Sequence, residues 1–290
     1  MPPDSPWARM APALFVLLWS TGFIGGKLGL PYAEPLTFLL VRMVLVAALL
    51  GGVALAVRAP WPKSRGEAGR IALAGLLVHG TYLGGVFTAL EHGLPAGTVA
   101  LVVGLQPLLT AAVAGPLLGE TVTGRQWLGF GLGLCGVALV VWEKLSLGPG
   151  MVAGLGLATL ALVGITAGTL YQKRHCGGMD LRSGTAIQYA ASAVLFGILA
   201  PLTEDMAIDW TGEFVFALAW LCLVLSVGAI FLLFALIRRG AASRVASLFY
   251  LTPPTTAIMA WLLFGETLGA FALAGMAVVA VAVALVLRKG

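Results

Sequence analysis

Charged residues are scarce in this chain. Asp, Glu, Lys and Arg account for 10% of its 290 residues and hydrophobic residues for 60%, whereas about a quarter of the residues of a soluble domain are charged. The mean hydropathy is +1.00. A soluble fold of this composition would expose apolar patches far beyond those that soluble monomers tolerate. The scarcity of charge therefore excludes a soluble domain and predicts an integral membrane protein surrounded by the lipid bilayer.

Cysteine is also rare, and its spacing shows no pairs. The three cysteines, Cys135, Cys176 and Cys222, are odd in number and scattered through the chain, which argues against a disulfide framework and a metal cluster. We therefore expect no metal and no cofactor. The first residues lack a basic start, a short apolar core and a small-residue cleavage site. We expect no removable signal peptide, so the first apolar segment should stay in the membrane.

The chain carries an internal duplication. Gly119-Glu120-Thr121 recurs as Gly265-Glu266-Thr267, 146 residues further along (residue 265 against residue 119). At the same spacing Pro107 meets Pro253, and Val137-Ala138-Leu139-Val140 meets Val283-Ala284-Leu285-Val286. The match needs no gap, and the spacing is half the chain. The sequence therefore predicts two repeats, residues 1–145 and 146–290.

Apolar stretches long enough to cross roughly 30 Å of hydrocarbon occur five times in each half. In the first half they cover about residues 10–29, 35–57, 71–90, 95–118 and 126–142. In the second half they cover about residues 150–172, 183–203, 213–237, 242–264 and 268–287. The sequence thus predicts an all-α membrane protein with ten transmembrane helices.

Basic residues set the expected orientation, because Lys and Arg near span ends favour the cytoplasm. With both termini cytoplasmic, fourteen of the 17 Lys and Arg residues lie in cytoplasmic segments, and only Lys27 and Lys144 lie outside. The outer side then receives an acidic cluster of Glu204, Asp205, Asp209 and Glu213. Because each half has an odd number of spans, the two five-helix repeats are inverted. Inverted repeats permit alternating access around a midplane site, which points to a transporter.

Motifs in both halves resemble a known family. Trp19-Ser20-Thr21-Gly22-Phe23, with Lys27 after it, is similar to the first-span motif of the drug/metabolite transporter superfamily, EamA type. The fourth-span pattern runs from Pro107 to Leu117-Leu118-Gly119-Glu120-Thr121 and recurs from Pro253 to Phe264-Gly265-Glu266. The resemblance covers essentially the whole chain and implies ten spans. Within the family, the YddG-like amino-acid exporters fit best, which implies export across a bacterial inner membrane.

Polar and aromatic residues gather at mid-depth, where polar groups should face the bundle interior or a wet cavity. Counting half a span from each end, at about 1.5 Å per residue, gives the candidate substrate-binding residues Trp19, Ser20, Thr21, His79, Tyr82, Gln106, Thr166, Ser226, Tyr250 and Thr252. His79, Tyr82 and Val86 share one helical face and form a candidate cavity wall. The aromatic residues either stack on flat or cationic substrates or only pack.

Several of these residues have two interpretations. His79 either contacts substrate or bonds a neighbouring helix. Pro107 and Pro253 remove amide donors and invite kinks; they are predicted to gate, and kinks that serve only packing are the alternative. Arg42, about seven residues into its span, either binds a carboxylate or ties helix carbonyls. Glu120 and Glu266 are expected to cap the next helix rather than to carry protons.

The polar residues also narrow the function. No carboxylate lies mid-span, which argues against coupling through a central protonated Glu. His79 is the only deep group that titrates near neutral pH, so either it carries the proton or transport is facilitated. Arg42 alone is too little for sugar-phosphate or nucleotide-sugar exchange, because phosphate usually meets several cations. An intramembrane hydrolase would need Ser20 and His79 within hydrogen-bond reach. A channel is a further alternative, but inverted halves suit alternating access better than a fixed pore.

The sequence thus predicts a secondary transporter, without catalytic residues, that exports small organic metabolites. Amino acids, aromatic ones among them, are the first candidates, and flat cations come next. The expected partners are a small-molecule substrate and the bilayer, with no nucleic acid, and the chain is expected to act as a monomer or weak homo-oligomer. The fifth and tenth spans carry few polar residues and are expected to form a scaffold away from the pathway.

Overall fold

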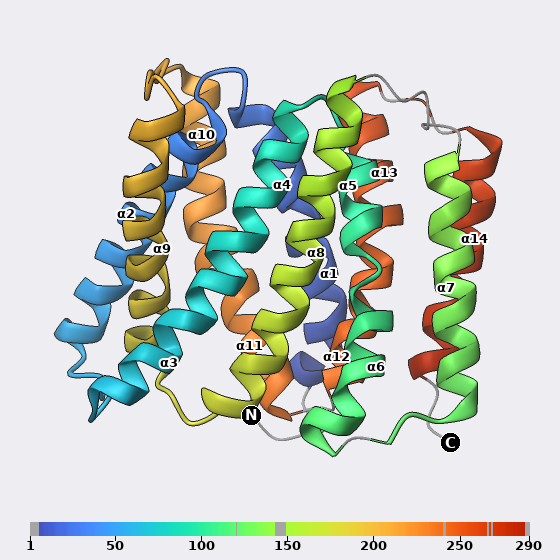
Figure 1. Ribbon diagram of the computed structural model, residues 1–290, viewed down its shortest axis with the longest axis horizontal. Coiled ribbons are helices and arrows are strands. Elements are labelled where there is room, and N and C mark those ends of the chain that lie inside the picture. Colours follow the sequence, from blue (N-terminus) through green and yellow to red (C-terminus); the bar gives the residue numbers. More distant parts are fainter. Residues whose placement is uncertain are drawn as a thin grey trace.

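The computed structural model describes residues 6–119, 121–142, 149–239, 242–265, 267 and 269–287. Glu120 and Glu266, for which helix capping is predicted, lie outside these residues. Within them the chain forms a bundle of helices, joined by turns that include one isolated β-bridge between Ala33 and Ile208 (Figure 1). The all-helical architecture predicted from the sequence is confirmed.

The first half contains seven α-helices and one π-helical segment, η1. They are α1 Pro6–Gly29, α2 Pro35–Ala56, α3 Arg65–Gly75, η1 Leu76–Thr81, α4 Tyr82–Glu91, α5 Ala96–Val103, α6 Gln106–Leu118 and α7 Gly124–Trp142. The second half contains α8 Pro149–His175, α9 Leu181–Thr203, α10 Gly212–Trp220, the π-helical η2 Leu221–Ala229, α11 Ile230–Arg239, α12 Ala242–Ser247, the 3-10 turn η3 Leu248–Leu251, α13 Thr252–Phe264 and α14 Ala270–Leu287.

Within the described residues, eight helical segments are long and apolar enough to cross a membrane. They are Met10–Gly29, Pro35–Ala56, Arg65–Glu91, Ala96–Gly115, Gly150–His175, Leu181–Thr203, Gly212–Arg239 and Val245–Phe264. Large apolar side chains such as Leu202 and Leu262 are exposed on their outer faces, as lipid contact requires. Helices α7 and α14 occupy the positions of the fifth and tenth predicted spans but are not among these eight, so the count of ten stays a prediction.

Interruptions occur at matching places in the two halves. The π-helical η1 interrupts the segment of α3 and α4, and the π-helical η2 interrupts that of α10 and α11. Helices α6 and α13 begin 146 residues apart, at Gln106 and Thr252, and each has a proline at its second position. Proline is tolerated in the first turn of a helix, because an N–H at that position would have no intrahelical partner. Kinks were predicted at Pro107 and Pro253; the structure instead has a helix start at each of them.

The ends of α6 and α13 also match. Each helix stops at a glycine in the left-handed region, Gly119 with φ 70° and Gly265 with φ 63°. A side chain would be strained in that conformation, whereas glycine reaches it freely and lets the chain leave the helix. The two glycines of the repeated Gly-Glu-Thr triplets are thus helix stops.

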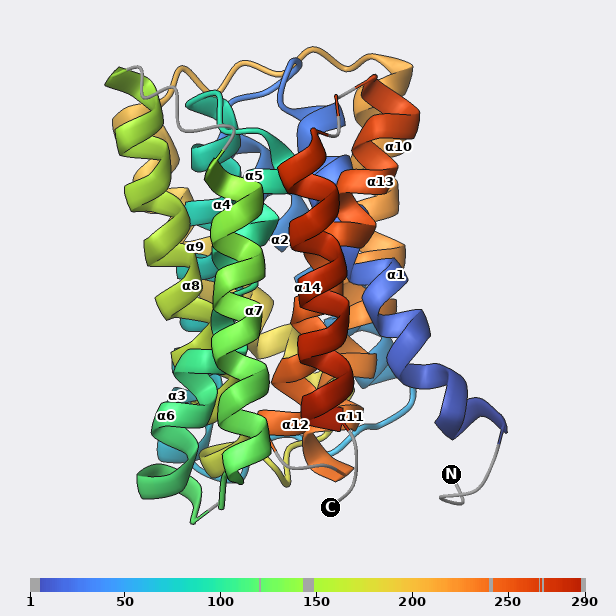
Figure 2. The ribbon, with the colours of Figure 1, turned by 90° about the vertical axis from the view of Figure 1, so that its right-hand side faces the viewer.

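The predicted acidic cluster ties the turns at one end of the bundle. The Glu204 carboxylate accepts hydrogen bonds from the backbone amides of Leu36 and Thr37, both at 2.7 Å, in the first turn of α2. A carboxylate suits the positive end of a helix dipole. Glu213 accepts from the Tyr32 hydroxyl, and this hydrogen bond raises the pKa of Tyr32. At the opposite end of the bundle α1 begins and α14 ends (Figures 1 and 2).

Helices from opposite halves of the chain pack against each other. α2 lies along α9, α8 along α4 and η1, and α1 along α13, α10 and η2. Close approach relies on glycine: a Cβ added to Gly85 in α4 would lie 2.6 Å from the Leu157 carbonyl oxygen of α8. The two halves therefore form one interleaved bundle, and its centre is shared between them.

Helices α7 and α14 form a separate layer at one side of the bundle (Figure 1). Gly136 in α7 faces α14 so closely that a Cβ there would lie 2.8 Å from the Gly275 carbonyl oxygen. Gly129 meets Val286 and the Ala282 carbonyl in the same way. Small residues that let backbones touch stabilise helix pairs in membranes, which fits the scaffold role expected of these two helices.

This contact predicts that Gly136→Ala destabilises the protein. The added Cβ would overlap the α14 backbone, so we expect the free energy of unfolding to fall by about 1–3 kcal/mol, as in other overpacked interiors. Gly131→Ala in the same helix is the matched control, because nothing lies within 4 Å of a Cβ at that position. Thermal unfolding in detergent measures both variants. Equal melting temperatures for the two would contradict the close α7–α14 contact.

Candidate functional site

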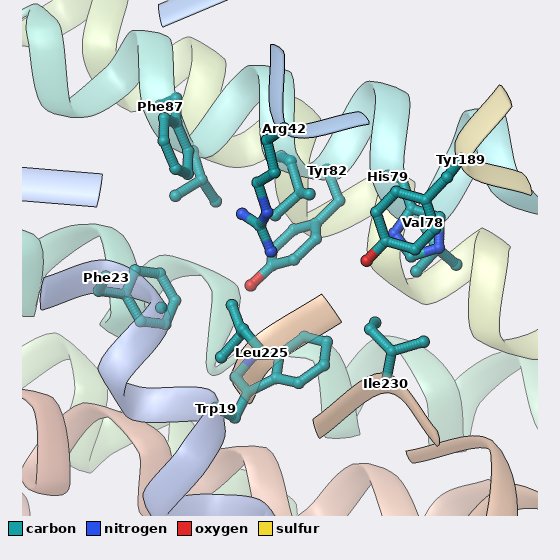
Figure 3. Close-up of a pocket in the computed structure, with 13 residues that line it drawn as sticks. Trp19, Phe23, Arg42, Val78, His79, Tyr82, Phe87, Tyr189, Leu225 and Ile230 are labelled. Atoms are coloured by element: carbon teal, nitrogen blue, oxygen red, sulfur yellow. The ribbon is translucent and has the colours of Figure 1, made fainter. Parts of the chain in front are cut away.

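A cavity lies at the centre of the bundle, between helices of both halves. Its lining comprises Trp19, Gly22 and Phe23 from α1, Arg42 from α2, Val78 and His79 from η1, Tyr82, Leu83, Val86 and Phe87 from α4, Tyr189 from α9, Leu225 from η2 and Ile230 from α11 (Figure 3). Its volume of about 20 Å³ is room for about one water molecule. The structure therefore holds this site in a closed form.

Aromatic rings build one wall of the cavity. Trp19 stacks on Tyr82 with ring centroids 5.9 Å apart and planes 17° apart. Phe249 packs edge-on against Trp19 at 5.1 Å from outside the lining. The predicted face of His79, Tyr82 and Val86 does line the cavity, although η1 is a π-helical rather than an α-helical turn. The wall offers flat apolar surfaces that suit a flat apolar group.

His79 stands in the π-helical turn and stacks on Tyr189, with ring centroids 4.1 Å apart. The ring is fully buried, and neither of its nitrogens has a hydrogen-bond partner among the described residues. The Tyr189 hydroxyl is likewise unpartnered there. Irregular π turns in helices are frequent at functional sites. Tyr189 was not among the predicted site residues. The feature of the sequence that could have identified it is a tyrosine hydroxyl inside an apolar span.

Arg42 brings a cation into the cavity and is 1% exposed. Its Nε and Nη2 donate to the Ser226 hydroxyl of η2, at 3.1 Å and 3.0 Å. Its Nη1 has no partner among the described residues, and the lining contains no carboxylate. One of the two interpretations of Arg42 was a tie to helix carbonyls, but its hydrogen bonds among the described residues go to the Ser226 hydroxyl instead. A buried cation without a counter-ion is costly.

Other predicted residues lie outside the lining and bond their surroundings. Ser20 donates to the Val16 carbonyl at 2.7 Å and to the Thr252 carbonyl at 3.4 Å, and Thr166 donates to the Leu162 carbonyl at 2.7 Å. Bonds to a carbonyl four residues earlier are the usual way for such side chains to satisfy themselves within a helix. Thr21 donates to Leu18 and accepts from the Trp220 indole at 3.0 Å.

Tyr250 faces away from the central cavity and toward α7. A Cβ added to Gly133 would lie 2.6 Å from its ring, and its hydroxyl donates to the Phe130 carbonyl at 3.4 Å. The structure thus places Tyr250 in the layer of α7 and α14, apart from Trp19 and Tyr82.

The two helix breaks contact each other. A Cβ added to Gly104, between α5 and α6, would lie 2.9 Å from Pro253 at the start of α13. Gln106 donates to the Thr169 hydroxyl of α8 at 3.1 Å, while its amide oxygen and the Thr252 hydroxyl have no partner among the described residues. None of Gln106, Pro107, Thr252 and Pro253 lines the cavity.

Ser20 and His79, the pair that a hydrolase would need, are not hydrogen-bonded to each other in the described part of the chain. The hydrogen bonds of Ser20 go to backbone carbonyls instead. No cluster of three His, Cys, Asp or Glu side chains occurs there that could hold a metal. The cavity can enclose a small molecule between aromatic rings, one cation and one histidine.

Comparison with known proteins gives a consistent picture. The sequence model of the EamA-like transporter family matches residues 7–142 and again residues 152–288. The chain is 28% identical to the "Uncharacterized transporter YvbV" of Bacillus subtilis (strain 168), over 96% of this chain and 90% of that protein. It is 26% identical to the "Probable amino-acid metabolite efflux pump" of Salmonella typhimurium, over 90% and 88%. A crystal structure at 20% identity matches over 96% of each chain with a TM-score of 0.76, so the fold is shared.

The Arg42–Ser226 pair predicts a distinctive pattern of stability. Ser226→Ala removes the acceptor of two charge-assisted hydrogen bonds, and we expect the free energy of unfolding to fall by about 1.5–3 kcal/mol. The double variant Arg42→Met/Ser226→Ala should recover this loss, because no buried charge is left unpaired. Thermal unfolding in detergent measures both.

Ser192→Ala serves as the control for the loss of a buried hydroxyl. Ser192 donates to the Gly75 carbonyl at 3.1 Å, a neutral bond, so its removal should cost less than the removal of Ser226. A double variant no more stable than Ser226→Ala would contradict the view that the uncompensated charge is the source of the loss.

Proposed function

Because the chain belongs to the EamA-like transporter family, we propose that it is a secondary transporter that exports amino acids or closely related metabolites across a bacterial inner membrane. The family model matches nearly all of the chain, which makes the protein a transporter and not an enzyme. The amino-acid assignment is supported by the similarity to the Salmonella protein named as a probable amino-acid metabolite efflux pump, at 26% identity, and by the chemistry of the central cavity.

The central cavity is the observation that carries this proposal. It combines the stacked pair Trp19 and Tyr82 with a buried Arg42 that lacks a carboxylate partner in the described lining. An amino acid offers a carboxylate for the cation and a side chain for the rings. A phosphorylated sugar or nucleotide sugar would usually meet several cations, so this alternative is disfavoured. Flat cations are disfavoured too, because the only charge of the lining is positive.

Alternating access is proposed as the mechanism, with two inverted five-helix repeats of residues 1–145 and 146–290. Three observations support the duplication: the family model matches twice, the π-helical segments η1 and η2 occupy matching places, and α6 and α13 begin 146 residues apart. Because η1, α4 and η2 all contribute to the closed cavity, movement of either half against the other would expose the site. Inverted repeats perform this function in other transporters.

The proposed topology has ten spans and both termini in the cytoplasm. It is supported by the position of the start of α1 and the end of α14 at the same end of the bundle (Figure 2), since an even number of crossings returns the chain to its starting side. In the predicted orientation, most of the Lys and Arg residues lie on this cytoplasmic side. A monomer is proposed as the transport unit, with any homo-oligomer weak.

Reconstituted liposomes test the amino-acid assignment. We expect saturable flux of at least one member of a radiolabelled panel of the twenty amino acids, competed by the unlabelled compound. Trp19→Ala should lower this flux at least about tenfold, because stacking aromatic contacts and their buried area are worth more than about 1.4 kcal/mol. Trp210→Ala is the matched control, since Trp210 is exposed at the surface. Absence of competed flux across the whole panel would refute the amino-acid assignment.

The pH dependence of flux in a His79 variant tests whether transport is coupled to protons. If His79 carries the coupled proton, flux should vary with pH, and His79→Gln should abolish that variation. The groups that face His79 are Arg42 from α2 and Tyr189 from α9. His92→Gln is the control, because His92 lies exposed at the end of α4 and bonds the Thr88 carbonyl. An unchanged pH profile in His79→Gln would leave His79 a packing residue and transport facilitated.

A further inference from the structure

We propose that the central cavity selects its substrate as a carboxylate, through Arg42, and does not require an ammonium group. This inference rests on the proposed function and narrows it: an apolar or aromatic monocarboxylate is the minimal ligand, and the amino group of an amino acid contributes little to binding. The substrate class is thereby defined by its negative charge.

The charge balance of the cavity is the first argument. Arg42 is fully enclosed by the bundle, and no Asp or Glu belongs to the lining that the structure describes. An ion is strongly disfavoured in an apolar interior unless an opposite charge accompanies it. The counter-ion that the described lining lacks is therefore expected to arrive with the ligand.

The orientation of the guanidinium is the second argument. Two of its nitrogens, Nε and Nη2, are occupied by the Ser226 hydroxyl, while Nη1 has no partner among the described residues. In Figure 3 the head group of Arg42 points from α2 into the cavity, toward the hydroxyl end of Tyr82. A guanidinium with free N–H donors binds a carboxylate through short, charge-assisted hydrogen bonds. Ser226 fixes the group so that the free donors face the cavity.

The absence of an anionic group in the described lining is the third argument, and it concerns the ammonium. The polar side chains of that lining besides Arg42 are His79, Tyr82 and Tyr189, and none of them supplies a fixed negative charge. An ammonium in the same small cavity would be repelled by Arg42. The Trp19 and Tyr82 rings then receive the apolar part of the ligand, which leaves the carboxylate as the group that is specifically recognised.

Direct binding to the purified full-length protein in detergent tests this inference without relying on transport. Isothermal titration calorimetry would compare phenylalanine, N-acetylphenylalanine and 3-phenylpropionate, which share a carboxylate, with phenethylamine, which has only the ammonium. We expect the three carboxylates to bind within about tenfold of one another and phenethylamine to bind at least about tenfold more weakly. Equal or tighter binding of phenethylamine, or no binding of any carboxylate, would overturn the proposal.

Variants of Arg42 supply the second arm of the test. Arg42→Gln should weaken each carboxylate about 10- to 100-fold and leave phenethylamine unchanged or improved. Arg239→Gln is the matched control, since Arg239 is exposed at the end of α11. Because the charge is buried without a counter-ion, Arg42→Gln should melt at or above the temperature of the unaltered protein. A lower melting temperature with unchanged carboxylate affinity would make Arg42 a structural residue.

Arg42→Lys keeps the measurement informative if Arg42→Gln fails to fold. Lysine retains the charge but lacks the planar guanidinium, which can hydrogen-bond Ser226 and a carboxylate at the same time. We therefore expect a several-fold loss of affinity for the carboxylates only. Unchanged affinity in this variant would count against recognition by the guanidinium.

The two proposals fail in distinguishable ways. If carboxylates bind in an Arg42-dependent manner but no amino acid crosses reconstituted liposomes, amino-acid export is refuted and carboxylate recognition stands. If amino-acid flux is present, yet phenethylamine competes as well as 3-phenylpropionate and Arg42→Gln retains the affinity, carboxylate recognition is refuted and export stands.

Discussion

The bilayer offers no water to a polar group, so the spanning part of the chain has to satisfy its polar groups internally. Ser20, Thr166 and Thr255 do so by donating to carbonyls one helical turn earlier, and the Glu204 carboxylate satisfies the first amides of α2. Several buried groups are exceptions within the described residues: Gln106 and Thr252 are two that lie outside the cavity, whereas Arg42, His79 and Tyr189 share it. Unpaired groups in a low-dielectric interior are costly. The meeting of Arg42, His79 and Tyr189 in one cavity is the reason that we propose this cavity as the ligand site.

The same centre is where the helices are least regular. His79 stands in η1, and Ser226, which holds Arg42, stands in η2. A π-helical turn bonds each amide to the carbonyl five residues earlier instead of four, which disturbs the stacking of side chains along the helix. A movement of η1 displaces the histidine, and a movement of η2 displaces the anchor of the arginine. A ligand that contacts both therefore interacts differently with the two arrangements, which is the condition for a ligand to shift a conformational equilibrium.

The sequence was sufficient for features set by local chemistry. The interruptions at Pro107 and Pro253 follow from the lack of an N–H in proline, although they are helix starts rather than the predicted kinks. The wall of His79, Tyr82 and Val86 follows from spacing. The rotation of each helix was not predictable, because lipid-facing and interior residues are equally apolar. Tyr250 was therefore expected at the site but faces α7. The pairing of Arg42 with Ser226 spans 184 residues, and no local pattern links such distant positions.

The packing around the closed cavity indicates which helix–helix contact opens more easily, α4 against α8 or α1 against η2. Between α4 and α8 the contact is backbone against backbone, since a Cβ at Gly85 would meet the Leu157 carbonyl oxygen at 2.6 Å. Between α1 and η2 glycines face side-chain ends instead: Cβ atoms at Gly22 and Gly25 would meet methyl groups of Leu225 and Leu221 at 2.8 Å. Leucine side chains change rotamer on a far shorter timescale than helices separate. Because Leu225 itself lines the cavity, a change of its rotamer would alter the shape of the cavity without moving either backbone of the α4–α8 contact.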